Sequence, residues 1–166
     1  MNSRDISRLS ELVKHVNSQP SKDRKLNYIA SHSDETIKKF LFYVYSKNHS
    51  FGVSKEECLA YNGAIADFNE YDNIFEMFNS ITAHEVDKSN AICGLLMGVA
   101  NRLSDDDKST FLDIIDKDLH LDLEPYELNV ALELGYWDNW FIEEYDEMLF
   151  NETKYSHVNK YKELVA

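Results

Sequence analysis

Apolar residues recur at three- and four-residue intervals along much of this chain, which is the spacing of one face of an α-helix. Near the N-terminus, Ile6, Leu9, Leu12, Val13 and Val16 follow that pattern. Glycine and proline, which mark turns and helix ends, are scarce, because the 166 residues include five glycines and two prolines. The sequence therefore predicts an all-α fold, a compact multi-helix bundle with short connections.

Polar residues that can cap a helix precede several of the apolar segments. Ser21, Ser33 and Ser104 are each placed to accept a hydrogen bond from the free N–H groups of a first helical turn. The segment Ser54-Lys-Glu-Glu57 has the spacing of a capping box. The predicted helices cover residues 3–16, 22–31, 34–45, 70–82, 91–100, 105–115 and 136–150, with a short helix after Ser54 and one that begins at Pro125 and that Gly135 can end.

Two of these helices carry further information about packing. Residues 37–45 are apolar nearly all round after Lys38 and Lys39, which predicts a central buried helix. Gly94 and Gly98 lie one turn apart on one face, which predicts close packing against a neighbouring helix. We expect one domain over residues 1–150, followed by a tail at 151–166 to which the sequence assigns no structure.

The two cysteines and the N-terminus bear on the cellular compartment. Cys58 and Cys93 are far apart in sequence and belong to no metal-type or redox-type motif, which favours a reduced, cytoplasmic chain. The first residues contain no apolar core of a secretory signal. No apolar run approaches the roughly 18 residues that cross a bilayer, so we expect no membrane partner.

The formal net charge is −13 at pH 7, which is unfavourable for binding to duplex DNA. Such binding draws its free energy from Lys and Arg side chains that displace the condensed counterions of the phosphates. A strong negative charge suits a protein partner with a basic surface or a mimic of DNA charge. Solubility alone is the simpler explanation and stays open.

The sequence presents no evident catalytic or cofactor site. It has neither a glycine-rich phosphate loop nor a Gly-x-Ser-x-Gly motif, and its six histidines are scattered, so we expect no enzyme activity and no cofactor. The acidic run Asp105–Asp107 is read as a helix N-terminus. The remaining candidate, a calcium loop, would need glycine where Leu121 stands. Its ligands would be Asp116, Asp118, His120, Asp122 and Glu127.

Aromatic and acidic residues alternate near the C-terminus, in a stretch that has no Lys or Arg from Asp118 to Thr153. Two readings are open: a helix that buries its aromatic side chains in the core, or an acidic surface that docks a basic partner through Trp and Tyr anchors. The candidate docking residues are Tyr136, Trp137, Trp140, Glu143, Glu144, Asp146 and Glu147.

Several segments, in order along the chain, resemble the N-terminal helical DNA-binding domain of phage-type ATP-dependent DNA ligases. Phe40–Val53 is similar to the ligase helix that ends in an "N-P-F-x-T-F-G-I"-like segment. Ala83–Ala91 is similar to the "R-x-L-T-G-N-x-A" turn. Phe111–Leu119 with Leu128–Val130 is similar to "I-L-x-R-D-L-x-x-G-x-S-x-x-x-x-N-K-V". The resemblance implies a phage-encoded protein with a ligase-type scaffold and a surface that faces the minor groove of duplex DNA. By that resemblance the DNA-facing residues are Ser46, Lys47, His49, Lys117 and Asn129.

The sequence departs from the ligase pattern at positions that matter for DNA. Ser89 replaces a turn glycine, Val130 replaces a lysine, and the corner between Lys117 and Asn129 is acidic. No Lys-x-Asp-Gly motif is present to take up AMP, so a complete ligase is not expected. We therefore expect a non-catalytic interaction protein that binds and modulates or inhibits a protein of DNA metabolism or host defence. The alternatives are a stand-alone accessory protein for duplex or nicked DNA and the non-catalytic half of a split ligase.

Overall fold

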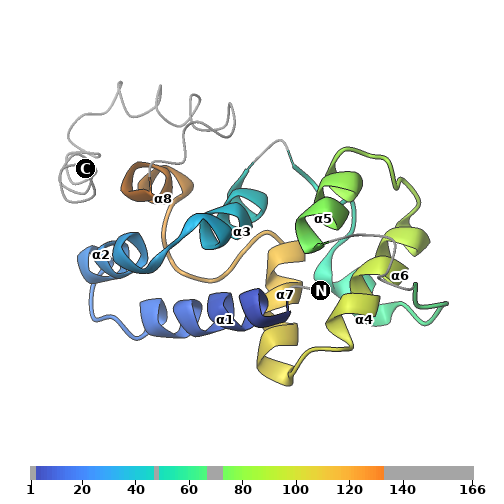
Figure 1. The fold of residues 1–166 in the computed structure, drawn as a ribbon, viewed down its shortest axis with the longest axis horizontal. Helices are drawn as coiled ribbons and strands as arrows, with labels where there is room; N and C mark the ends of the chain where they lie inside the picture. Colours follow the sequence, from blue (N-terminus) through green and yellow to red (C-terminus); the bar gives the residue numbers. More distant parts are fainter. Residues whose placement is uncertain (1–2, 47–48, 67–72, 133–166) are drawn as a thin grey trace. The chain divides into compact units, whose positions relative to one another are not determined.

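The computed structural model describes residues 3–46, 49–66 and 73–132, and these residues form α-helices joined by loops, with no strand among them (Figure 1). The all-α prediction is confirmed for this part of the chain. None of the helices described is long and apolar enough to cross a bilayer. The helices are α1 (Ser3–Asn17), α2 (Lys22–His32), α3 (Glu35–Tyr45), α4 (Lys55–Ala60), α5 (Ile74–Thr82), α6 (Ser89–Ala100), α7 (Asp105–Ile115) and α8 (Pro125–Leu132).

Most of the predicted caps are present. The Ser21 hydroxyl accepts a hydrogen bond from the backbone N–H of Arg24, and Ser104 does the same for Asp107. At the start of α4, the Ser54 hydroxyl accepts from Glu57 N–H while the Glu57 carboxylate accepts from Ser54 N–H. This reciprocal pair is the predicted capping box.

The start of α3 differs from the prediction by one residue. Asp34, not Ser33, is the N-cap, and its carboxylate accepts a hydrogen bond from Ile37 N–H at 3.0 Å. Ser33 instead ends α2, which extends to His32. The carboxylate of Asp34 is also the better cap for the partial positive charge of a helix N-terminus.

The chain divides into two compact units, and the domain predicted at residues 1–150 includes parts of both. Unit 1 contains Met1–Ser10 and His49–Leu119, and unit 2 contains Glu11–Asn48 and His120–Ala166. Helices α4 to α7 therefore belong to unit 1, and α2, α3 and α8 belong to unit 2, while α1 begins in one unit and ends in the other. Because each unit joins two separate segments, no linker marks a boundary in the sequence.

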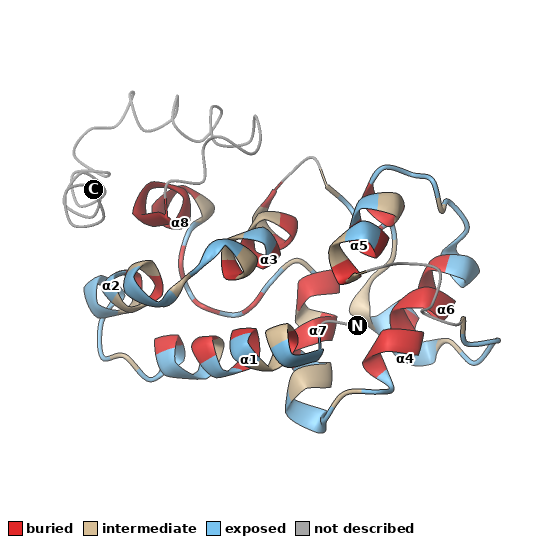
Figure 2. Cartoon of the chain, in the orientation of Figure 1, coloured by how far each residue is buried: buried red, intermediate tan, exposed pale blue. Residues whose placement is uncertain are grey.

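Unit 1 is built around α6 and a group of phenylalanines. Every residue of α6 from Ile92 to Ala100 is buried (Figure 2), so α6 is buried nearly all round. The Phe78 ring lies edge-on to Phe51, with centroids 5.0 Å apart, and stacks on Phe111 at 6.0 Å. These three side chains are fully buried and link α5 and α7 to the loop before α4.

Unit 2 is held by the packing of α2 against α8. Leu26 and Ile29 of α2 are buried, as are Phe40 and Leu41 of α3. Lys39 of α3 is exposed, whereas every residue of α3 after it, from Phe40 to Tyr45, is buried or half-buried. Helix α8 is buried from Tyr126 to Leu132.

Candidate functional site

Two of the predicted DNA-facing residues, Ser46 and Asn129, are buried in unit 2. Ser46 is 0% exposed, and its backbone N–H bonds to the carbonyl of Phe42 at the end of α3. Asn129 is 1% exposed, and among the described residues neither its amide oxygen nor its amide nitrogen has a hydrogen-bond partner. Side chains in these positions do not reach a ligand at the surface, so their placement does not support DNA contact.

Lys117 and His49, two further members of the predicted set, lie together in unit 1. The Lys117 ammonium donates a hydrogen bond to the His49 carbonyl oxygen. Lys117 also follows the last turn of α7 with a φ of +60°, the left-handed conformation that glycine usually adopts after a helix. The lysine thus ends α7 and holds the loop before α4. Lys47 and the predicted docking residues Tyr136, Trp137, Trp140, Glu143, Glu144, Asp146 and Glu147 lie outside the described residues.

In the acidic corner between α7 and α8, apolar and polar side chains alternate between the core and the solvent. Leu119, Leu121 and Leu123 are buried there, while His120 and Asp122, each with a positive φ, are exposed. No group of three or more His, Cys, Asp or Glu side chains in the described part of the chain is arranged to hold a metal.

Glu127, the twelfth position of the considered calcium loop, is a buried capping residue. Its carboxylate is fully buried and lies 3.3 Å from the Lys22 ammonium. The same carboxylate accepts a hydrogen bond from Glu124 N–H at 3.0 Å, which satisfies a backbone donor at the start of α8. Glu127 therefore fixes α8 and pairs it with α2.

The two cysteines, which are far apart in the sequence, are neighbours in unit 1. Cys58 of α4 and Cys93 of α6 are buried, free thiols whose Sγ atoms lie 3.9 Å apart. Burial, the neighbouring Cys93 and Glu57 raise the pKa of the Cys58 thiol to about 12, and burial also raises the pKa of Cys93. Both sulfurs are thus neutral and poor nucleophiles at neutral pH, and we assign them to the packing of α4 on α6.

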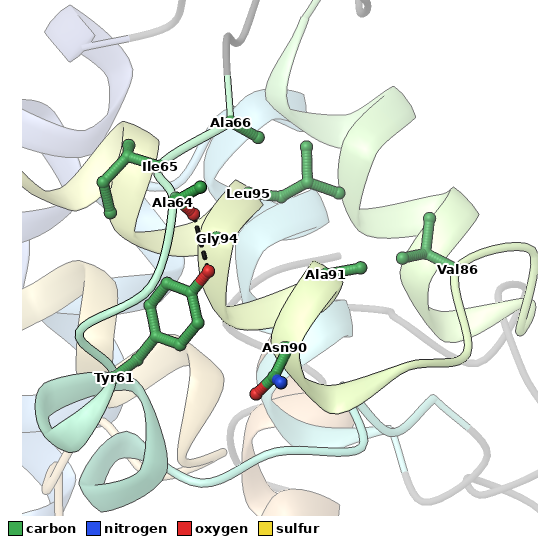
Figure 3. A pocket seen from close by; sticks show the side chains of 9 residues that line it. All are labelled: Tyr61, Ala64, Ile65, Ala66, Val86, Asn90, Ala91, Gly94 and Leu95. Carbon is green, nitrogen blue, oxygen red and sulfur yellow. Dashed lines mark hydrogen bonds between the residues drawn. The ribbon is translucent and has the colours of Figure 1, made fainter.

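An apolar pocket of about 450 Å³ opens beside these helices, entirely within unit 1 (Figure 3). One wall is the loop after α4, where the Tyr61 hydroxyl donates a hydrogen bond to the Ala64 carbonyl at 2.6 Å. The opposite side is formed by Val86, and the floor by the first turns of α6. The side chain of Ile65 at this loop is 50% exposed, and Leu59 of α4 is 53% exposed. The lining residues are Tyr61, Ala64, Ile65, Ala66, Val86, Asn90, Ala91, Gly94 and Leu95.

Gly94 and Gly98 create the space in which this loop lies on α6. A Cβ on Gly94 would come within 2.9 Å of the Ala64 carbonyl oxygen, and one on Gly98 within 2.6 Å of the Ala66 carbonyl oxygen. Ala66 N–H donates to the Gly94 carbonyl at 3.2 Å. The predicted close packing at these glycines is present, but its partner is a loop backbone and not a second helix.

The exposed charges of unit 1 are predominantly acidic. Its described residues include twelve acidic and seven basic side chains, and nine of the acidic but only four of the basic residues are exposed. Two of the less exposed lysines are used internally, since Lys55 pairs with Asp113 at 3.2 Å and Lys117 bonds to His49. The surface of unit 1 is therefore more acidic than its composition alone indicates. In unit 2 the described exposed residues are more balanced, with six acidic and four basic.

Comparison with protein-family models, with curated proteins and with solved structures finds no match to this chain. The candidate site is therefore defined by its own geometry. The sequence reading missed the pocket, although two signals pointed to it. These were the glycine pair on α6 and the small residues Gly63, Ala64 and Ala66, which together permit a loop to approach a helix closely.

Proposed function

We propose that this protein is a non-catalytic interaction protein whose acidic unit 1 binds a partner protein with a basic surface. The observation that carries the proposal is the excess of exposed acidic side chains among the described residues of unit 1, nine against four basic. Complementary charge accelerates encounter and selects among partners. An exposed apolar pocket in the same unit supplies the short-range contacts that charge alone does not.

The proposal includes a ligase-type helical scaffold and a partner from DNA metabolism or host defence, and both rest on the sequence resemblance. The placement of Ser46 and Asn129 in the core, together with the internal hydrogen bond of Lys117, favours a protein ligand over duplex DNA. A partner that normally holds DNA has a basic groove, and an acidic domain can occupy such a groove by charge and by volume.

The test is affinity purification of the tagged full chain from its native host, followed by identification of the retained proteins and a salt titration of each complex. A partner with a basic surface, whose affinity falls as salt rises, supports the proposal. The acidic surface is tested with a triple variant of unit 1, Glu56→Gln, Glu85→Gln and Asp87→Asn. The matched control, Glu11→Gln, Asp23→Asn and Asp122→Asn, removes the same charge from unit 2.

We expect the unit 1 variant to weaken the complex and the unit 2 variant to leave it nearly unchanged. Equal weakening by both variants contradicts the assignment to unit 1. Fluorescence anisotropy with labelled duplex and nicked DNA is measured in parallel. A DNA affinity that falls steeply with salt, and that Lys117→Ala weakens, overturns the proposal in favour of a DNA-binding accessory protein.

A further inference from the structure

We infer that the pocket of unit 1 takes one apolar side chain, the size of Leu, Ile or Met, from a Lys- or Arg-rich segment of the partner. This inference rests on the proposed function and specifies the part of the partner that is recognised.

The pocket has the size and lining for such a side chain. Its volume is about 450 Å³, whereas a cavity of about 150 Å³ is enough for a benzene ring. The extra space admits the branched end of an aliphatic side chain together with part of its backbone. Ala91, Leu95 and Val86 present only carbon atoms to this space (Figure 3), so an apolar group entering it exchanges water for apolar contacts.

Two polar groups of the lining are suited to the backbone of an entering segment. The Tyr61 hydroxyl uses its hydrogen in the bond to Ala64 O, so its oxygen is left as an acceptor for a backbone N–H. The exposed Asn90 amide carries both a donor and an acceptor. Because these groups suit a peptide backbone, they favour a polypeptide over a purely apolar small molecule.

Acidic residues on the Val86 side set the charge of the segment. Glu85 and Asp87 directly flank Val86 in the chain, both are exposed, and they outnumber the one exposed lysine beside them, Lys88. A lysine or arginine next to the anchoring residue would therefore meet a carboxylate as the apolar side chain enters. Exposed ion pairs contribute only about 0.2 to 1 kcal/mol each. They therefore favour a basic segment over a neutral one, while the buried apolar side chain provides more of the binding free energy.

The experiment uses the ¹⁵N-labelled full chain and three synthetic peptides at low ionic strength. The probe is Lys-Lys-Gly-Leu-Gly-Lys-Lys. In the second peptide Asn replaces Leu, and in the third Ser replaces every Lys. Shifts of backbone amide signals report the site and the dissociation constant. We expect the probe to shift the signals of Ala64–Ala66 and Asn90–Leu95, and to bind about tenfold more tightly than the Asn peptide.

Two variants test the pocket itself. Ala91→Phe fills it, and we expect the variant to bind the Leu and Asn peptides equally, whereas Ser109→Phe on the exposed face of α7 retains the difference. Neutralising the flanking acids with Glu85→Gln and Asp87→Asn weakens both lysine peptides by a factor of about two to five. The matched pair Asp105→Asn and Asp106→Asn has a smaller effect.

The remaining outcomes separate the inference from the proposed function. Equal binding of the Leu and Asn peptides to the unmodified protein overturns the inference, even if Ala91→Phe fails to fold. If the serine peptide binds as tightly as the probe, the pocket does not require Lys or Arg in its ligand, and it takes an uncharged apolar segment instead. If the lysine peptides do not bind but the purified partner does so in a salt-dependent manner, the inference fails and the proposed function stands.

Discussion

Replacing Gly98 with alanine tests whether the loop at residues 61–66, which lines the pocket, packs closely against α6. In an exposed helix interior, Gly to Ala stabilises a protein by about 1 kcal/mol, because alanine loses less conformational freedom. Here the new Cβ would lie 2.6 Å from the Ala66 carbonyl oxygen and 3.4 Å from Cγ2 of Ile65. The first contact involves backbone, so the loop itself must move.

The expected net effect of Gly98→Ala is destabilisation. Forcing extra volume into a packed site costs about 1 to 3 kcal/mol. Displacement of the loop also weakens the Ala66 N–H to Gly94 carbonyl bond, at about 1 kcal/mol. After the helix-propensity gain of about 1 kcal/mol, the free energy of unfolding should fall by about 1 to 3 kcal/mol. Gly94→Ala, with its closest contact at 2.9 Å, should cost less.

Urea denaturation followed by circular dichroism measures these changes. Ala91→Gly, in the exposed first turn of the same helix, is the matched control, since it reports the propensity difference without a clash and should cost up to about 1 kcal/mol. If Gly98→Ala instead raises the free energy of unfolding by about 1 kcal/mol, as much as the control lowers it, the loop does not lie on α6 and the reasoning is refuted. If Gly98→Ala also loses peptide binding, the position of this loop on α6 is needed to form the pocket.

Three further predictions concern buried polar groups. Asn129→Leu removes two buried amide atoms that have no partner among the described residues and should raise the free energy of unfolding by about 1 kcal/mol; a lower free energy of unfolding, measured by urea denaturation, would indicate that Asn129 has a partner. Glu127→Ala leaves the Lys22 ammonium and Glu124 N–H unpaired and should cost about 1 to 3 kcal/mol, whereas Glu127→Gln, which keeps the N–H acceptor, should cost less. The raised pKa of Cys58, from 9.0 to about 12, means that the folded state retains a proton that the unfolded state releases, so stability should fall as pH rises from 9 towards 12. The Cys58→Ala, Cys93→Ala variant should show a flatter stability profile in that range, and native thiols should react with Ellman's reagent far more slowly than denatured ones.

The helices were predictable from sequence because their signals are local. A capping residue and the apolar stripe that follows it are contained in one segment, so the starts at Ser21, Ser54 and Ser104 were found correctly. At Ser33 the signal was ambiguous, since Ser33 and Asp34 can both cap a helix, and the extension of α2 to His32 decided between them.

The site was less predictable because it depends on contacts between distant segments. The proximity of Cys58 and Cys93 follows from the packing of α4 on α6, which no spacing in the sequence reveals. The same packing forms the pocket, whose lining comes from a loop at 61–66 and a helix that begins at Ser89. Asn129 also depends on tertiary packing: the resemblance placed this polar residue at a DNA-facing surface, whereas the structure buries it in the core of unit 2.

The division of each unit into two segments has a consequence for synthesis on the ribosome. Residues 11–48 emerge early, but α8, which packs against α2, is complete only at Leu132. Unit 1 likewise needs its first ten residues together with a segment that ends at Leu119. Neither unit can fold completely until its second segment has been synthesised, so the apolar faces of the early helices stay exposed to solvent until then. If the chain were cut after Asn48, each piece would carry one segment of both units, and the pieces would have to reassociate as a complementing pair.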